Sequence, residues 1–158
     1  MIRIIAVGKM KEAASVALLK EYVKRIGGYS KLELIEVEDE KNGDRDSEKE
    51  QELVKQKEGK RILAKIKPEE YVILLSLQGD MISSESLSSK IHQLFVQGKS
   101  TITFIIGGSL GTSQEIAQRA NWLWKLSDLT FPHQLVRVML AEQIYRAFTI
   151  QNQLPYHK

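Results

Sequence analysis

The 158-residue sequence contains no cysteine and only three prolines. Without thiols there is no disulfide framework, no thiolate metal site, no cysteine nucleophile and no CxxC redox motif. No apolar stretch approaches the roughly 20 residues that a membrane-spanning helix needs. The chain also lacks a signal-peptide pattern, because the apolar run at positions 2–7 is broken by Arg3 and ends at Gly8 and Lys9. We therefore expect a cytoplasmic protein with no membrane segment.

The sequence also has no large excess of charge of either sign. The 23 Lys and Arg residues face 20 Asp and Glu residues, which gives a formal net charge of +3. This excess permits an acidic partner such as RNA but is too small to argue for one. Hydrophobic residues at 42% and charged residues at 27% are ordinary for a globular protein. At this length, a single domain spanning residues 1–158 is the expectation.

Four apolar segments predict buried strands. They are residues 2–7, 32–37, 71–75 and 101–106. Between them, apolar residues recur every three or four positions, which predicts amphipathic helices that end at Gly27, Pro68 and Gly98. Strands that alternate with crossover helices indicate an α/β fold with a mainly parallel sheet and helices on both faces. Ligands bind beyond the carboxyl ends of such strands, so functional loops should follow Leu75 and Ile106.

Two other features receive no chemical role. The strongly charged stretch at residues 36–52, which contains Asn42 and Gly43, is predicted to be a solvated loop that leads into a helix. None of the three histidines stands four residues from another metal ligand. The sequence therefore predicts no metal site.

The most informative loop is the glycine-rich segment 107–111, Gly-Gly-Ser-Leu-Gly, between a predicted strand and a predicted helix at 112–120. Its G-x-S-x-G pattern matches the nucleophile elbow of serine hydrolases, and Asp128 followed by His133 or His157 supplies acid and base in the required order. The remainder of the chain leaves little room for the further strands of a hydrolase. The glycines also suit a nucleotide loop, although the full G-x-G-x-x-G spacing is missing. A plain strand-to-helix turn is the third interpretation.

Motifs spread along the chain separate these alternatives. They are Ala-Val-Gly-Lys at 6–9, Glu-Gly at 58–59, Ile-Gly-Gly at 106–108, Leu-Ser-x-Leu-Thr-Phe-Pro-His at 126–133, Val-Arg-Val and Glu-Gln-Ile-Tyr-Arg-Ala within 136–147, and Pro-Tyr-His-Lys at 155–158. In this order and spacing they resemble the RlmH family over essentially the whole length. At Leu110, where that family usually has a polar residue, the sequence departs from the pattern, so Ser109 and Leu110 are poor candidates for essential contacts.

The resemblance implies a SPOUT methyltransferase with a C-terminal trefoil knot, S-adenosylmethionine as cofactor and a homodimer as the working unit. It implies methylation of N3 of a pseudouridine in large-subunit (23S) ribosomal RNA, on the assembled ribosome. By position, the resemblance places the cofactor against Leu75, Gly107, Leu126, Ser127, Asp128, Leu129, Thr130 and Phe131. An apolar slot for adenine and glycines that admit close backbone approach suit this ligand.

The catalytic residues expected from the resemblance and from side-chain chemistry are His133, Arg137, Tyr156 and His157. Either histidine suits the role of acceptor for the N3 proton, and Arg137 suits the binding of phosphate or developing charge. Dimerisation would let the tail of one subunit complete the site of the other. No metal is expected, because methyl transfer from a sulfonium needs none. The alternatives are a serine hydrolase using Ser109 and a non-catalytic RNA-binding domain.

An apolar stripe at Val136, Leu140, Ile144 and Phe148 has two interpretations. Residues spaced by four lie on one face of a helix, which is the usual signature of core packing. Further apolar residues widen the stripe beyond one face, and this is consistent with the seam of a dimer. The sequence leaves both open.

Overall fold

A computed structural model describes residues 1–41, 43 and 45–158 of the chain. The elements, in order, are β1 (Ile2–Val7), α1 (Ala13–Ile26), β2 (Leu32–Val37), α2 (Glu48–Leu63), β3 (Tyr71–Asp80), α3 (Ser84–Val96), β4 (Ile102–Ile106), α4 (Gln114–Arg119), β5 (Trp122–Trp124) and α5 (His133–Gln151). The strands form one sheet in the order β2-β1-β4-β3-β5, and every neighbouring pair is parallel. The predicted α/β fold with a parallel sheet is confirmed.

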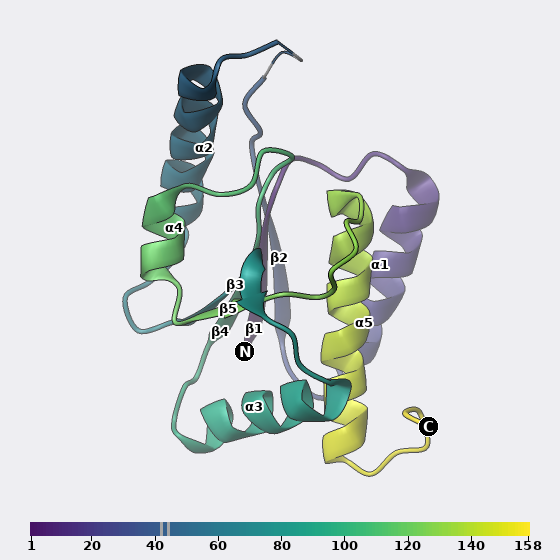
Figure 1. The fold of residues 1–158 in the computed structure, drawn as a ribbon. Coiled ribbons are helices and arrows are strands. Elements are labelled where there is room, and N and C mark those ends of the chain that lie inside the picture. Colours follow the sequence, from purple (N-terminus) through teal and green to yellow (C-terminus); the bar gives the residue numbers. More distant parts are fainter. Residues whose placement is uncertain (42, 44) are drawn as a thin grey trace.

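Helices cover both faces of this sheet, as predicted (Figure 1). Helices α1, α3 and α5 lie on one face, and α2 and α4 lie on the other. The central strands β1 and β4 are buried along their whole length. Their side chains alternate, so that Ile4 and Phe104 join the core under α1, α3 and α5, whereas Ile5 and Ile105 join the core under α2 and α4. Two-sided burial explains why these strands are continuous apolar runs.

The stripe on α5 is part of the chain's own core. Leu140, Ile144 and Phe148 are buried, and α5 packs between α1 and α3. Only Val136, in the first turn of the helix, remains partly exposed. Core packing thus accounts for most of the stripe, and the predicted dimer finds no support in it.

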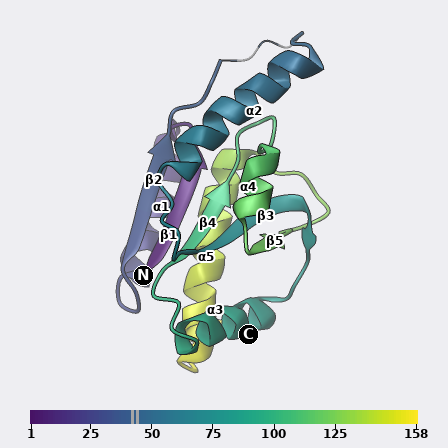
Figure 2. The same cartoon turned by 90° about the vertical axis from the view of Figure 1, so that its left-hand side faces the viewer.

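The main difference from the predicted strands lies at one edge of the sheet. β3 continues beyond Leu75 to Asp80, and β5 is a short strand that the sequence analysis did not predict. The register between them shifts after Leu75, and β3 curves beside β5 (Figure 2). Gly79 packs directly on the β5 backbone, since a Cβ built there would lie 2.5 Å from the carbonyl carbon of Leu123. The trefoil knot expected for this part of the chain stays a prediction.

The charged stretch at 36–52 divides into three parts. Glu36 and Val37 complete β2, and α2 begins at Glu48 behind a capping box formed by Ser47 and Glu50. Of the predicted loop between them, residues 42 and 44 lie outside the described residues. Within the described ranges, no helix is both long and apolar enough to traverse a lipid bilayer.

Candidate functional site

A cavity of about 980 Å³ opens at the carboxyl ends of β3, β4 and β5. Its walls are residues 74–78, 106–114, 123–127 and 129–133, with Glu52, Lys55, Ala117 and Val136. Because the strands are parallel, the segments that follow them meet at one edge of the sheet. The cavity therefore lies where the sequence predicted functional loops, after Leu75 and Ile106.

Seven of the eight residues expected to hold the cofactor line this cavity. They are Leu75, Gly107, Leu126, Ser127, Leu129, Thr130 and Phe131. The eighth, Asp128, is not part of the lining; its exposed side chain forms an ion pair with Lys125. The loop is folded locally by Ser127, whose hydroxyl accepts a hydrogen bond from the Leu129 N–H at 3.0 Å. Three members of the lining, Leu75, Leu126 and Leu129, give one wall the apolar character that an adenine ring requires.

The glycine-rich segment 107–111 forms a tight turn beside this wall. The Gly111 N–H donates to the Gly108 carbonyl at 3.0 Å, and Gly111 has φ +89°, which favours glycine. At Gly107 a side chain has no room, because a Cβ would lie 2.7 Å from Cγ2 of Thr112. Helix α4 then begins after Ser113 and not at residue 112. The turn presents its backbone to the cavity.

The geometry around Ser109 does not support a serine hydrolase. Ser109 lies exposed in the turn, and among the described residues no hydrogen bond joins it to a histidine. Asp128, the proposed acid, pairs with Lys125, while His157 pairs with Glu85. A Ser-His-Asp triad requires that its members form one hydrogen-bonded chain. His133, the other candidate base, lines the same cavity as Ser109, but among the described residues no hydrogen bond joins it to Ser109 or to Asp128. The three groups therefore do not form the hydrogen-bonded chain of a triad.

His133 is the one predicted catalytic residue that lines the cavity. It is the first residue of α5, directly after the N-cap residue Pro132. Burial lowers the pKa of His133, and the nearby charge of Arg137 lowers it further, whereas Asp39 acts in the opposite direction. The lowered pKa favours the neutral imidazole, the form that can accept a proton at a ring nitrogen.

Arg137 points away from the cavity into the sheet. Its side chain is 2% exposed. The guanidinium donates to the Val7 carbonyl at 2.6 Å, to the Gly8 carbonyl at 2.8 Å and to Glu36 at 3.0 Å. These bonds fasten the end of β1 to α5. The expected phosphate-binding role does not fit this burial, and anchoring is what the contacts indicate.

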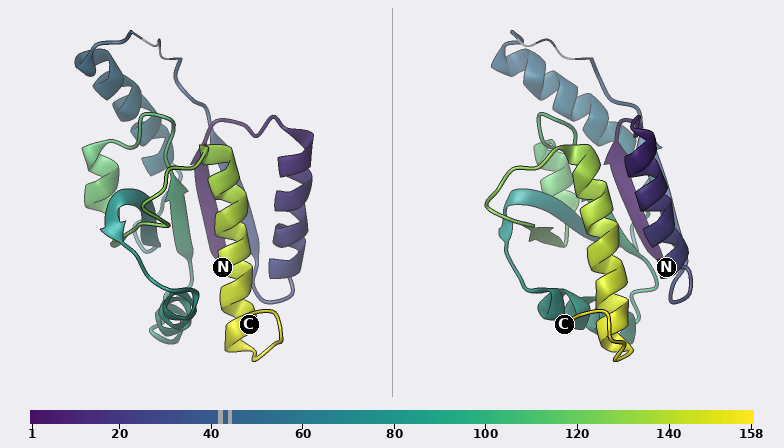
Figure 3. Two further views of the ribbon diagram at one scale, coloured as in Figure 1. Left: turned by 45° about the vertical axis from the view of Figure 1, so that its right-hand side comes forward. Right: turned by 90° about the vertical axis from the view of Figure 1, so that its right-hand side faces the viewer.

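The chain beyond α5 folds back beside the helix (Figure 3), so that Tyr156 and His157 contact residues 142–146 of α5 and not its first turn, where His133 lies. The Tyr156 hydroxyl donates to Glu142 at 3.0 Å, and burial raises the pKa of this phenol. The His157 ring lies 2.9 Å from Glu85 and 3.1 Å from Arg146. Within one chain, these two residues are therefore not brought together with the cavity.

Sequence reasoning missed the contribution of β5. Leu123 and Trp124 both line the cavity, and Trp124 is 3% exposed. Among the residues that the structure describes, its buried indole N–H has no hydrogen-bond partner. The run Trp-Leu-Trp was the available signal, since aromatic residues favour strands. A cofactor with an aromatic base and polar edges fits these features together. They are the unpaired indole N–H of Trp124, the apolar wall of leucines and the glycine turn at 107–111.

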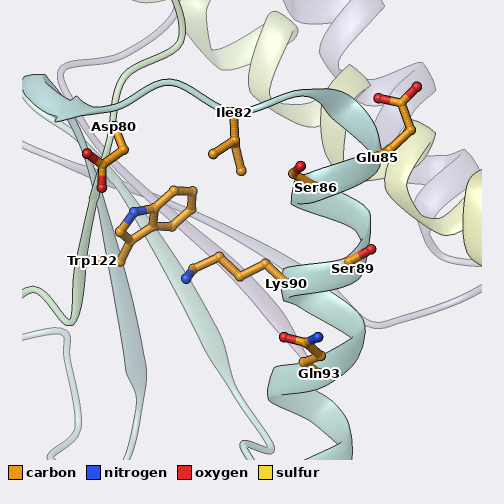
Figure 4. A pocket seen from close by; sticks show the side chains of 8 residues that line it. All are labelled: Asp80, Ile82, Glu85, Ser86, Ser89, Lys90, Gln93 and Trp122. Atoms are coloured by element: carbon orange, nitrogen blue, oxygen red, sulfur yellow. The ribbon is translucent and has the colours of Figure 1, made fainter.

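A second hollow, of about 490 Å³, lies between α3 and Trp122 (Figure 4). It is lined by Asp80, Ile82, Glu85, Ser86, Ser89, Lys90, Gln93 and Trp122. The Lys90 ammonium sits over the Trp122 ring, 4.4 Å from its centroid, where it makes a cation–π contact. None of the predicted site residues lies here. In the described part of the chain, no group of three or more His, Asp or Glu side chains could hold a metal ion.

Comparisons with known proteins agree with the fold. A family model described as "Predicted SPOUT methyltransferase" matches residues 1–157. The chain is similar to a probable methylase family protein from Haemophilus influenzae Rd KW20, with a TM-score of 0.55 and 15% identity over 99% of this chain and 70% of that one. It is also similar to a putative methyltransferase from Legionella pneumophila in complex with the bound cofactor SAM, with a TM-score of 0.49, 10% identity, and coverage of 92% and 66%.

Proposed function

Because the chain belongs to the SPOUT methyltransferase family, we propose that it methylates N3 of a pseudouridine in large-subunit ribosomal RNA, as RlmH-type enzymes do. S-adenosylmethionine is its cofactor, in keeping with the family. The observation that supports the site of action is the 980 Å³ cavity, which the glycine turn and the 126–131 loop border together. We place the reaction on ribosomal RNA of the assembled ribosome, in the cytoplasm.

The residues around the cavity have defined tasks in this proposal. Leu75, Leu126 and Leu129 hold the adenine, and the backbone of the 107–111 turn fixes polar edges of the cofactor. When bound, the cofactor supplies an electrophilic methyl group. The protein contributes mainly by holding donor and acceptor in near-attack geometry and by keeping water out.

The N3 proton of the base has to leave before or during attack. His133 is suited to accept it at a ring nitrogen, because its lowered pKa favours the neutral imidazole. Arg137 supports this role indirectly, since its buried guanidinium holds the first turn of α5 against the end of β1. Its positive charge adds to burial in lowering the pKa of His133.

Tyr156 and His157 would act in a homodimer. Helix α5 has 19 residues, which correspond to about 28 Å of length at 1.5 Å per residue. His133 is the first residue of this helix, whereas Tyr156 and His157 contact Glu142 and Arg146, about 14 to 20 Å further along it. Neither residue lines the cavity of its own chain, so we propose that the segment of one subunit completes the site of its partner.

The test of the function combines binding and turnover. Calorimetry with S-adenosylmethionine and S-adenosylhomocysteine should show one site per chain, and Gly107→Trp should abolish it because the added side chain has no room. Ribosomes from a strain lacking the gene should accept one methyl group, located by mass spectrometry of the RNA. Absence of binding to either ligand would overturn the proposal.

Complementation tests the homodimer. Removal of residues 155–158 should abolish methyl transfer while cofactor affinity stays nearly unchanged. Mixing this variant with Gly107→Trp should restore partial activity, since one hybrid site then combines an intact cavity with an intact tail. Proven heterodimers that stay inactive would show that each chain supplies its own segment.

A further inference from the structure

A buried carboxyl group lies behind the glycine turn. Glu58, on the inner face of α2, is 4% exposed. Its Oε1 accepts a hydrogen bond from the Glu40 N–H at 3.1 Å, whereas Oε2 has no partner among the described residues. A buried polar atom without a partner is rare and calls for an explanation. The catalytic scheme above makes no use of it.

The unpaired oxygen faces the turn. A Cβ built on Gly108 would lie 2.9 Å from Oε2 of Glu58 and 3.3 Å from Cγ1 of Val7. Gly108 itself lines the cavity. Glu58 therefore lies against two segments, the Glu40 segment beyond β2 and the glycine turn beyond β4, which β1 separates in the sheet.

The helix that carries Glu58 is firmly seated. At the next position, Gly59, a Cβ would lie 2.5 Å from the hydroxyl oxygen of Ser113, the N-cap residue of α4. Helix α2 thus packs against the segment directly after the turn. Because α2 is packed in this way, the Glu58 side chain can determine the position of the 107–111 turn.

Opposing influences act on the carboxyl group. Burial, the largest of them, raises the pKa of Glu58, the hydrogen bond from the Glu40 N–H lowers it, and the charge of Asp39 raises it. Arg61 also lowers this pKa, but it forms an ion pair with Glu40 and donates to the Glu38 carbonyl at 2.9 Å. In its ionised form a carboxyl group accepts hydrogen bonds through both oxygens, so Oε2 can accept one from a backbone N–H.

We propose that Glu58 is a positioning residue for the cofactor, which holds the 107–111 turn from behind and pairs through Oε2 with a backbone N–H of that turn when the cofactor is bound. The inference rests on the proposed function and adds a residue that does not touch the ligand. It explains both the unpaired oxygen and the requirement for glycine at 108.

The first experiment compares Glu58→Gln, which retains an acceptor, with Glu58→Leu, which is similar in size but has none. Affinity for S-adenosylhomocysteine should fall about tenfold in Glu58→Leu, the worth of one hydrogen bond, and less than about threefold in Glu58→Gln. Hydrogen exchange of the 107–111 amides should slow on ligand binding in the wild type and in Glu58→Gln only. Lys57→Ala, an exposed neighbour on the same helix, is the control and should match the wild type.

A double-mutant cycle keeps the inference testable if Glu58→Leu does not fold. Gly108→Ala should weaken ligand binding in the wild type, because its methyl group meets the carboxyl oxygens at 2.9 and 3.4 Å. In a Glu58→Ala background, the same substitution should have a smaller effect. Additive effects, or wild-type affinity and exchange in Glu58→Leu, would overturn the inference while the proposed function stands. A wild-type protein that binds no cofactor would overturn both.

Discussion

The close approach of β3 and β5 at Gly79 gives the sharpest test of the fold. In Gly79→Ala, the new methyl group would lie 2.5 Å from the Leu123 carbonyl carbon and oxygen and 2.6 Å from the Trp124 nitrogen. These are backbone atoms, which cannot swing aside as a side chain can. Overpacking of this kind costs about 1 to 3 kcal/mol. For a domain of this size we therefore expect the Tm to fall by about 2 to 12 °C.

The same substitution should also disturb the cavity. Residues 74–78 and 123–127 form two of its walls, and the shift that relieves the clash moves one against the other. Calorimetric unfolding and titration with S-adenosylhomocysteine should both detect the change. Gly28→Ala is the matched control, because a Cβ there meets only the Arg25 carbonyl at 3.6 Å, an ordinary contact. If Gly79→Ala kept the wild-type Tm and affinity, the close approach of the two strands would be refuted.

Three further predictions concern individual side chains. Arg137→Met should lower the free energy of unfolding by about 2 to 4 kcal/mol in urea titrations, because buried carbonyls lose their donors; unchanged stability with lost RNA affinity would instead support phosphate binding. Ser109→Ala should retain methyl transfer, and Ser109 should resist fluorophosphonate labelling, since within the described ranges no hydrogen bond joins it to a histidine; labelling would support the hydrolase hypothesis. The His157 hydrogen bond lowers the pKa of Glu85 from 4.5 to about 2, so this pair stabilises the fold above pH 4.5 and ceases to do so as the pH falls toward 2. Titration by NMR should give that value, and His157→Ala should return it toward 4.5.

Much of the architecture could be predicted from local patterns. The central strands are continuous apolar runs because both faces of the sheet are covered, so β1 and β4 were correctly located to within one residue. The glycines of segment 107–111 predicted a tight turn. The order and spacing of the motifs, through their resemblance to a known family, predicted the cofactor loop at 126–131. Parallel topology then brings both loops to one edge, so seven of eight expected cofactor residues line one cavity.

Contacts between distant segments could not be predicted in this way. β5 has three residues, too few for a periodic signal, and its strand character depends on pairing with β3. Arg137 looked like a phosphate ligand by residue type, but its partners Val7 and Gly8 lie about 130 residues earlier, so only folding reveals its burial. The Glu-Gly motif at 58–59 was recognised in the sequence. The position of the Glu58 carboxyl group behind Gly108, however, could not be predicted from it.

The sequence by itself thus determined four of the five strands, although not the extension of β3, as well as which loops meet at the carboxyl edge and the family to which the chain belongs. These depend on local periodicity and on short motifs, which the order of residues contains directly. The tertiary structure alone decided the orientation of each polar side chain. His133 faces the cavity, Arg137 faces the core, and Tyr156 packs back on Glu142 in the middle of α5. The reason is physical: a buried polar group is placed by its partners, and those partners come from parts of the chain that only packing brings together.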